Sequence, residues 1–214
     1  EGRVNVSGTV HLILKDESKL TIKEGIELTG NSTYLTIYGQ INGTGQLIST
    51  TVVNSKAGIG VSTGKSLTIY GGKVVAKGGE YAAGIGGYNS NGGTIMIYGG
   101  NIAATGGERA AGIGGGANGN GGTITIQGGN ITAKGGKYAA GIGGGVYRNA
   151  GTIRIQGGNI TATGGERGSG IGSGSDSANP GTITIQGGNI TAVGGRSAAG
   201  IGGRKFTTGT NGSA

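Results

Sequence analysis

Cysteine and tryptophan are absent from the 214 residues, and proline and histidine each occur once. Without cysteine the chain has no disulfide framework and no thiolate metal site. The lone proline and the lack of a three-residue glycine period exclude a collagen helix. A single histidine, His11, cannot form a histidine-based metal site. We expect it to lie on a strand of the first coil.

Glycine, in contrast, supplies 57 residues. A disordered glycine-rich chain would lack isoleucine at fixed spacing, whereas isoleucine recurs here with a regular period. The glycine content therefore indicates an ordered fold with many tight turns.

Long apolar runs are also missing. No stretch of 18 apolar residues occurs, so the sequence predicts no membrane span. The chain starts at Glu1, with neither an initiating methionine nor a signal peptide, which is typical of a processed protein or an excised fragment.

Acidic residues are scarce, with nine against 17 lysines and arginines, and the formal net charge is +8. Residues 1–27 hold five acids against four bases, and the remainder holds four against thirteen. Such a chain could attract anionic polymers such as acidic glycans, teichoic acids or nucleic acid. Because the bases are scattered over several faces, we interpret the charge mainly as a source of solubility and expect no nucleic-acid partner.

Five imperfect copies of one unit run from Leu67 onward, the later ones beginning at Thr94, Thr123, Thr152 and Thr182. Equivalent positions lie 28, 29, 29 and 30 residues apart in the column Tyr70, Tyr98, Gln127, Gln156 and Gln186. Each copy holds three short segments with alternating apolar residues, separated by glycine pairs that suit sharp corners. The predicted fold is all-β, a right-handed parallel β-helix (β-solenoid) with three short strands per coil and about 29 residues per coil.

A three-strand coil buries its apolar residues only by stacking like residues over like. The predicted inward columns are Leu67, Ile95, Ile124, Ile153 and Ile183; Ile69, Ile97, Ile126, Ile155 and Ile185; Val74, Ile102, Ile131, Ile160 and Ile190; and Ile85, Ile113, Ile142, Ile171 and Ile201.

We expect a single domain over residues 1–214, with degenerate coils in 1–66, five regular repeats in 67–206 and a polar tail in 207–214. Ala57–Gly60 is interpreted as the first copy of the Ala-Gly-Ile-Gly element. Neither end carries an amphipathic cap, although open strand edges normally need one. We therefore expect either a module of a longer solenoid or end-to-end stacking, with Val4–Val10 as an extension strand in the second case.

The outward positions also form columns, which we interpret first as stabilising ladders and second as binding features. Amide ladders are predicted for Asn101, Asn130, Asn159 and Asn189 and for Gln127, Gln156 and Gln186. A charged corner column runs through Glu80, Glu108, Lys137, Glu166 and Arg196. Its neighbour, Tyr81, Arg109, Tyr138 and Arg167, suits cation–π stacking.

Tracts such as TITIQGGNITAKGGKYAAGIGGG, which begins at Thr123, resemble the glycine-rich repeats of large bacterial cell-surface proteins of the Firmicutes type. The lead-in LTIYGQINGTGQLIST resembles the segment that precedes such repeats. The resemblance covers about 180 residues. It implies an adhesin or carbohydrate-binding protein with a pectate-lyase-like right-handed parallel β-helix, located outside the cell. The basic charge departs from that pattern and leaves the ligand open.

Catalysis on a β-helix needs carboxylates, and few are present. After Leu28 the only acids are Glu80, Glu108, Glu166 and Asp176. Glu80 and Glu108 lie one coil apart, close enough for a glycosidase pair, but their matched corner position favours a surface ladder. We expect no enzyme activity.

Cofactor motifs fail as well. Gly58–Ser66 resembles a phosphate loop, but Ile59 takes the place of its first glycine, and no helix is expected to follow. A calcium loop at Ser173–Gly181 would have Asp176 as its only carboxylate. An ice-binding threonine array is interrupted by Met96 and Arg154. No cofactor or metal is therefore predicted.

The sequence favours a non-catalytic extracellular structural protein, either a rigid stalk or a filament subunit that associates with copies of itself or with neighbouring coils. The alternative is a module that binds anionic or neutral polysaccharide on an outer face. The residues expected on that glycan or ladder face are Tyr70, Tyr98, Tyr81, Arg109, Tyr138 and Arg167.

Overall fold

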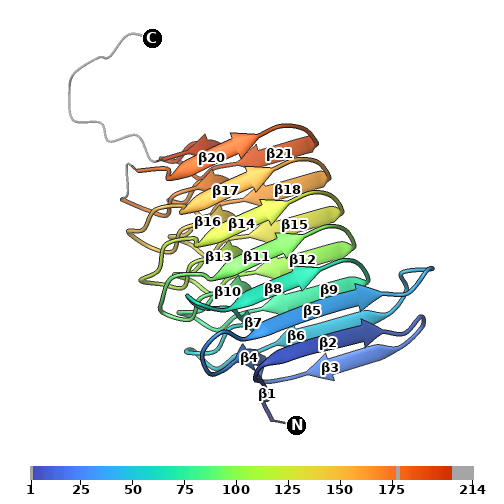
Figure 1. Ribbon diagram of the computed structural model, residues 1–214. Helices are drawn as coiled ribbons and strands as arrows, with labels where there is room; N and C mark the ends of the chain where they lie inside the picture. Colours follow the sequence, from blue (N-terminus) through green and yellow to red (C-terminus); the bar gives the residue numbers. More distant parts are fainter. Residues whose placement is uncertain (1, 177–178, 204–214) are drawn as a thin grey trace, which may run out of the picture.

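The computed structural model describes residues 2–176 and 179–203, which form a β-solenoid of three parallel sheets (Figure 1). The described residues contain no helix. Sheet I consists of β2 (Thr9–Leu14), β5 (Tyr34–Gly39), β8 (Ser66–Ile69), β11 (Thr94–Ile97), β14 (Thr123–Ile126), β17 (Thr152–Ile155) and β20 (Thr182–Ile185).

Sheet II follows along the chain in every coil. It consists of β3 (Lys19–Ile22), β6 (Gln46–Thr50), β9 (Lys73–Lys77), β12 (Asn101–Thr105), β15 (Asn130–Lys134), β18 (Asn159–Thr163) and β21 (Asn189–Val193). Sheet III has very short strands, namely β1 (Val4–Val6), β4 (Ile26–Leu28), β7 (Ile59–Gly60), β10 (Ile85–Gly86), β13 (Ile113–Gly114), β16 (Ile142–Gly143), β19 (Ile171–Gly172) and β22 (Ile201–Gly202).

Every strand pairs with the strand one coil away, in parallel and in the register that the repeats predict. Ile126 lies between Ile97 and Ile155, and Ile142 lies between Ile113 and Ile171. Like residues thus stack on like through seven coils of three strands, preceded by β1. The predicted β-solenoid with about 29 residues per coil is confirmed.

The core is a stack of isoleucine layers inside the three sheets. The predicted columns are buried from Leu67 to Ile171, and most of their members have no exposed surface. Earlier coils continue them with Leu35, Ile37 and Leu47. The last layer keeps the predicted register, but Ile183 and Ile190 are only half-buried and Ile185 and Ile201 are exposed. No described strand covers the outer edges of β20, β21 and β22, so one side of this layer faces solvent.

Sheet III starts earlier than the repeats indicate. Ala57–Gly60 is the first Ala-Gly-Ile-Gly sequence, but Ile26 pairs with Ile59 in sheet III and Val4 pairs with Ile26. Val4–Val10 is not a single extension strand. Val4–Val6 pairs with β4, and Val10 belongs to β2 of sheet I.

Glycine is required at the ends of the later sheet III strands, β10, β13, β16, β19 and β22. Gly143 has a φ of 134°, a region open to glycine but rarely to other residues. A Cβ atom on Gly143 would lie 2.0 Å from the carbonyl oxygen of Gly172 in the next coil. The side chain is therefore excluded by both the backbone conformation and the close approach of the next coil.

The turns after β2 and β5 project further from the solenoid than the corresponding turns of later coils (Figure 1). They are joined through Asp16, whose carboxylate accepts hydrogen bonds from the backbone N–H groups of Asn42 and Thr44 at 3.2 and 3.1 Å. The backbone N–H of Asp16 in turn donates to the side chain of Gln40 at 2.9 Å. These bonds tie together the two irregular turns.

Candidate functional site

Four aromatic rings stack along the end of sheet I. The ring centroids of His11 and Tyr38 are 5.8 Å apart, those of Tyr38 and Tyr70 are 5.2 Å apart, and those of Tyr70 and Tyr98 are 4.6 Å apart. The rings lie within 23° of parallel, so they meet face to face. His11 lies on the strand of the first coil, as predicted. Tyr70 therefore has an aromatic ring against each of its faces, and Tyr98 turns one ring face toward Tyr70.

Amide ladders occupy the outward positions of later coils. Asn130 donates to Asn101 at 2.9 Å, Asn189 donates to Asn159 at 3.0 Å, and Gln156 donates to Gln186 at 3.3 Å. The predicted ladders are confirmed for these pairs. A further contact joins Asn118 to Asn89 at 2.7 Å in the loops after sheet III, where no ladder was predicted.

The corner between sheets II and III holds the predicted tyrosine and arginine column. The Arg109 guanidinium lies 5.5 Å from the centre of the Tyr81 ring, which confirms one cation–π contact. Tyr138 is paired differently, since the ammonium of Lys137 lies 5.5 Å from its ring centre. A hydrogen bond to the Glu80 carboxylate raises the pKa of Tyr81 above its ordinary value.

The neighbouring charged column forms no ion pair among the described residues. Glu80, Glu108, Lys137, Glu166 and Arg196 alternate partly in sign, but the ion pairs of the described chain lie in the first two coils. Long exposed side chains gain little from pairing in water. The expected stabilising charge ladder is therefore wrong.

Three of the expected residues line a hollow of about 220 Å³ at this corner. Arg109, Tyr138 and Arg167 come from three successive coils, and Val146 and Tyr147 complete the lining. Tyr70, Tyr98 and Tyr81 do not line it. Val146 and Tyr147 were not predicted, although the loop after Gly143 sets them apart from the other copies. The equivalent residues of the neighbouring copies are small or polar, namely Ala117 and Asn118 in one and Ser175 and Asp176 in the other.

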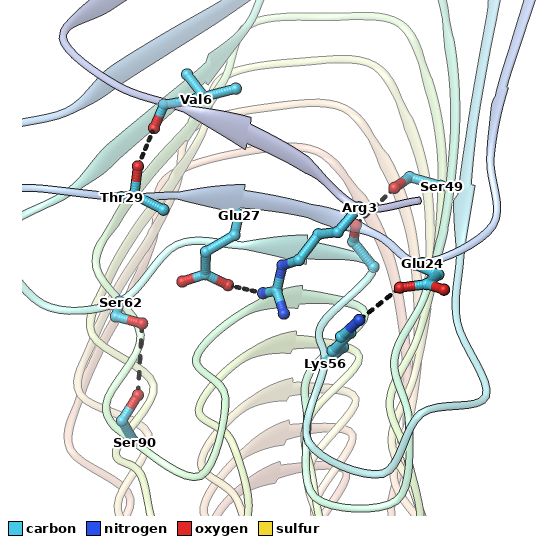
Figure 2. A network of polar contacts seen from close by, with 10 residues as sticks. Arg3, Val6, Glu24, Glu27, Thr29, Ser49, Lys56, Ser62 and Ser90 are labelled. Atoms are coloured by element: carbon cyan, nitrogen blue, oxygen red, sulfur yellow. Dashed lines mark hydrogen bonds and ion pairs between the residues drawn. The ribbon is translucent and has the colours of Figure 1, made fainter. Parts of the chain in front are cut away.

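A second polar cluster lies between the first two coils (Figure 2). Figure 2 shows the Arg3 guanidinium donating to Glu27 and the Lys56 ammonium pointing toward Glu24. Lys56 donates to the Glu24 carboxylate at 2.6 Å. Glu27 lies above Gly60, which has no side chain to displace it. The cluster is an ion-pair network, and neither pair was predicted.

The hydrogen bond from Lys56, together with its positive charge, lowers the pKa of the Glu24 carboxyl below its ordinary value. A lowered carboxyl pKa in the folded chain stabilises the fold above the ordinary carboxyl pKa. This contribution is lost as the pH falls through the lowered value. We expect Glu24→Gln to reduce the melting temperature slightly at neutral pH and to have no effect in strongly acidic buffer. Thermal unfolding followed by circular dichroism at both pH values checks this, and an equal shift at both would contradict the ion pair.

Residues 2–176 and 179–203 contain no group of three histidine, aspartate or glutamate side chains placed to hold a metal ion. They also contain no helix long and apolar enough to cross a membrane.

A comparison with known families identifies the repeats. The family described as Beta helix repeat matches residues 67–90, 95–117, 124–146, 153–175 and 183–203, just over half of the chain. The chain belongs to the beta helix repeat family. Each matched segment of this beta helix repeat protein starts on a strand of sheet I and continues past sheet III. Tyr147 falls between two matched segments, whereas Arg109, Tyr138 and Arg167 lie within them. The protein shows no significant similarity to a curated protein or to a solved structure.

Proposed function

We propose that this beta helix repeat protein is a non-catalytic structural module of a bacterial cell surface, acting as a rigid stalk or as the subunit of an end-to-end filament. The unbroken parallel register supports this most directly, because each coil pairs strand for strand with its neighbours in all three sheets. Bending between two coils would have to break or stretch hydrogen bonds in three sheets at once. A body built in this way resists bending, as a stalk must.

The side-chain ladders add to the same stiffness. The rings of Tyr38, Tyr70 and Tyr98 and the amide pairs on sheets I and II join successive coils. Stacked aromatic pairs contribute about 0.5–1.5 kcal/mol each beyond the area they bury. The outer surface thus strengthens contacts between coils, and the covered faces of Tyr70 and Tyr98 give less support to sugar stacking on that surface.

Self-association would join the two ends of the solenoid. On the first coil the inward Leu20 is exposed and Val10 and Leu12 are only partly buried, and Ile185 and Ile201 are exposed on the last described coil. The outer edges of β2 and β20 have no described partner strand, so a second copy could continue both the sheets and the core. Such a head-to-tail contact joins two different surfaces, and copies stacked along one axis propagate it into a filament. It would bring the slightly acidic first coils toward the basic remainder of the next copy.

Negative-stain electron microscopy of the purified chain, at rising concentration and without a partner, tests this function. Filaments with an axial repeat of one rod are the result expected of a filament subunit. Straight, separate rods at every concentration are the result expected of a stalk. Bent or compact particles would contradict a rigid structural role. Release of reducing ends from a panel of polysaccharides would contradict the absence of catalysis.

A further inference from the structure

The hollow between the fourth and sixth coils is the place where the repeat is broken most clearly. Val146 forms a buried part of its lining, and Arg109, Tyr147 and Arg167 are exposed around it. The backbone N–H of Val146 donates to the carbonyl oxygen of Arg109 at 3.0 Å. Ala117 makes the equivalent bond to Tyr81 one coil earlier, and this equivalence establishes which loop residues correspond.

Tyr147 occupies a backbone position that disfavours it. Its φ is 60°, in the left-handed region, where asparagine and aspartate are the common residues other than glycine. Among the corresponding loop residues, Asn89 has a φ of 42° and Asp176 a φ of 57°, whereas the φ of Asn118 is not positive. An exposed tyrosine held in this conformation has no packing reason to be there, since 63% of its surface is accessible. Strained residues of this kind cluster at ligand sites.

The polar groups around the hollow are available to a ligand. Its lining contains two arginines and no acidic residue. Glu108 and Glu166, which directly precede these arginines in the sequence, belong to the neighbouring charged column. Neither Arg109 nor Arg167 forms an ion pair with a described residue. The hydroxyl groups of Tyr138 and Tyr147 make no hydrogen bond within the described chain. The lining thus offers two guanidinium groups, two phenol groups and one free ring.

We propose that this hollow binds one acidic sugar residue of a polysaccharide, a pyranose that carries a carboxylate or a sulfate. Guanidinium groups bind such oxyanions through paired, charge-assisted hydrogen bonds. The Tyr147 ring supplies a flat apolar surface for the carbon face of the sugar. The hollow of about 220 Å³ is smaller than the roughly 300–1,000 Å³ of sites for drug-sized ligands, which fits one residue with the polymer continuing outside.

A nucleic acid fits the same groups less well. Single strands are held by aromatic side chains that stack successive bases along a basic groove. Tyr147 is not repeated, since the corresponding residues of the neighbouring loops are Asn118 and Asp176. One free ring at a single corner provides a place for one sugar and no track for a strand.

Three single substitutions test the site by isothermal titration calorimetry. The probes are tetragalacturonate, a dextran sulfate oligomer of the same length, and the neutral sugar maltotetraose. Tyr147→Asn and Arg167→Gln change the hollow, and Arg154→Gln removes the same charge from sheet I of the same coil. The melting temperature of each variant is measured alongside. Asparagine relieves the left-handed strain, so Tyr147→Asn is expected to keep or raise the melting temperature.

We expect at least one anionic probe to bind, with affinity reduced about tenfold by Tyr147→Asn and by Arg167→Gln, and less than about twofold by Arg154→Gln. The anionic probe that binds more tightly identifies the acid group. Equal losses from Arg154→Gln and Arg167→Gln would show a general charge effect and overturn the site. So would equal binding of maltotetraose, or no binding of either anion. Tighter binding of a single-stranded oligonucleotide to the same residues would overturn the sugar assignment.

Discussion

Replacing Gly143 with alanine is expected to destabilise the solenoid by about 3 kcal/mol or more. The new Cβ atom would lie 2.0 Å from the carbonyl oxygen of Gly172, far inside the van der Waals limit. The φ of 134° adds backbone strain that alanine cannot avoid. Neither problem can be relieved locally, because β16 is hydrogen-bonded between β13 and β19.

Gly71→Ala is the matched control for this substitution. The Cβ atom built on Gly71 has its nearest neighbour, the backbone nitrogen of Gly39, at 3.4 Å, and its φ is not positive. We expect the free energy of unfolding of the control to differ from that of the parent chain by about 1 kcal/mol or less. Urea unfolding followed by circular dichroism measures both variants. Equal free energies of unfolding for Gly143→Ala and Gly71→Ala would show that sheet III tolerates a side chain at position 143.

Ile126→Ala should cost about 2–5 kcal/mol. Ile126 has no exposed surface and lies between Ile97 and Ile155 in the core. Truncation removes apolar contacts and leaves a cavity that the neighbouring coils cannot close, because their strands are held in register on both sides. The loss should be near the upper end of that range if the backbone stays rigid.

Thr132→Ala is the control for Ile126→Ala, because Thr132 lies on the outward, exposed side of β15. We expect it to change the free energy of unfolding by about 0.5 kcal/mol or less. Chemical unfolding of the two variants under the same conditions gives the comparison. A loss for Ile126→Ala no larger than that for Thr132→Ala would contradict an isoleucine core.

The sequence was sufficient to predict the regular coils because their repeats align themselves. Once Ile97, Ile126 and Ile155 are recognised as equivalent, parallel register and burial follow from the need to cover apolar strands. The first coils were harder to assign. Ile26 is followed by Glu27 instead of the glycine that follows Ile59, so its place in sheet III is evident only from the strand pairing.

The candidate site was predictable only in part, because it depends on loop conformation and side-chain rotamers. Arg109 and Tyr138 could be placed on one column by spacing alone. The choice of Lys137 as the partner of the Tyr138 ring depends on rotamers, which spacing does not specify. The left-handed backbone of Tyr147 belongs to a loop outside the repeats, where length and sequence vary.

The shared register of the coils also limits how the length of such a protein can change. Adding one repeat of about 29 residues inserts a complete layer, and every column of the core continues through it. Adding half a repeat would place strands of sheet I against strands of sheet II and direct isoleucines to solvent. Recombination between repeats can therefore lengthen or shorten the rod only in whole layers. Smaller insertions are accommodated in the turns between strands, such as the longer turns after β2 and β5 and the loops after sheet III that hold Tyr147.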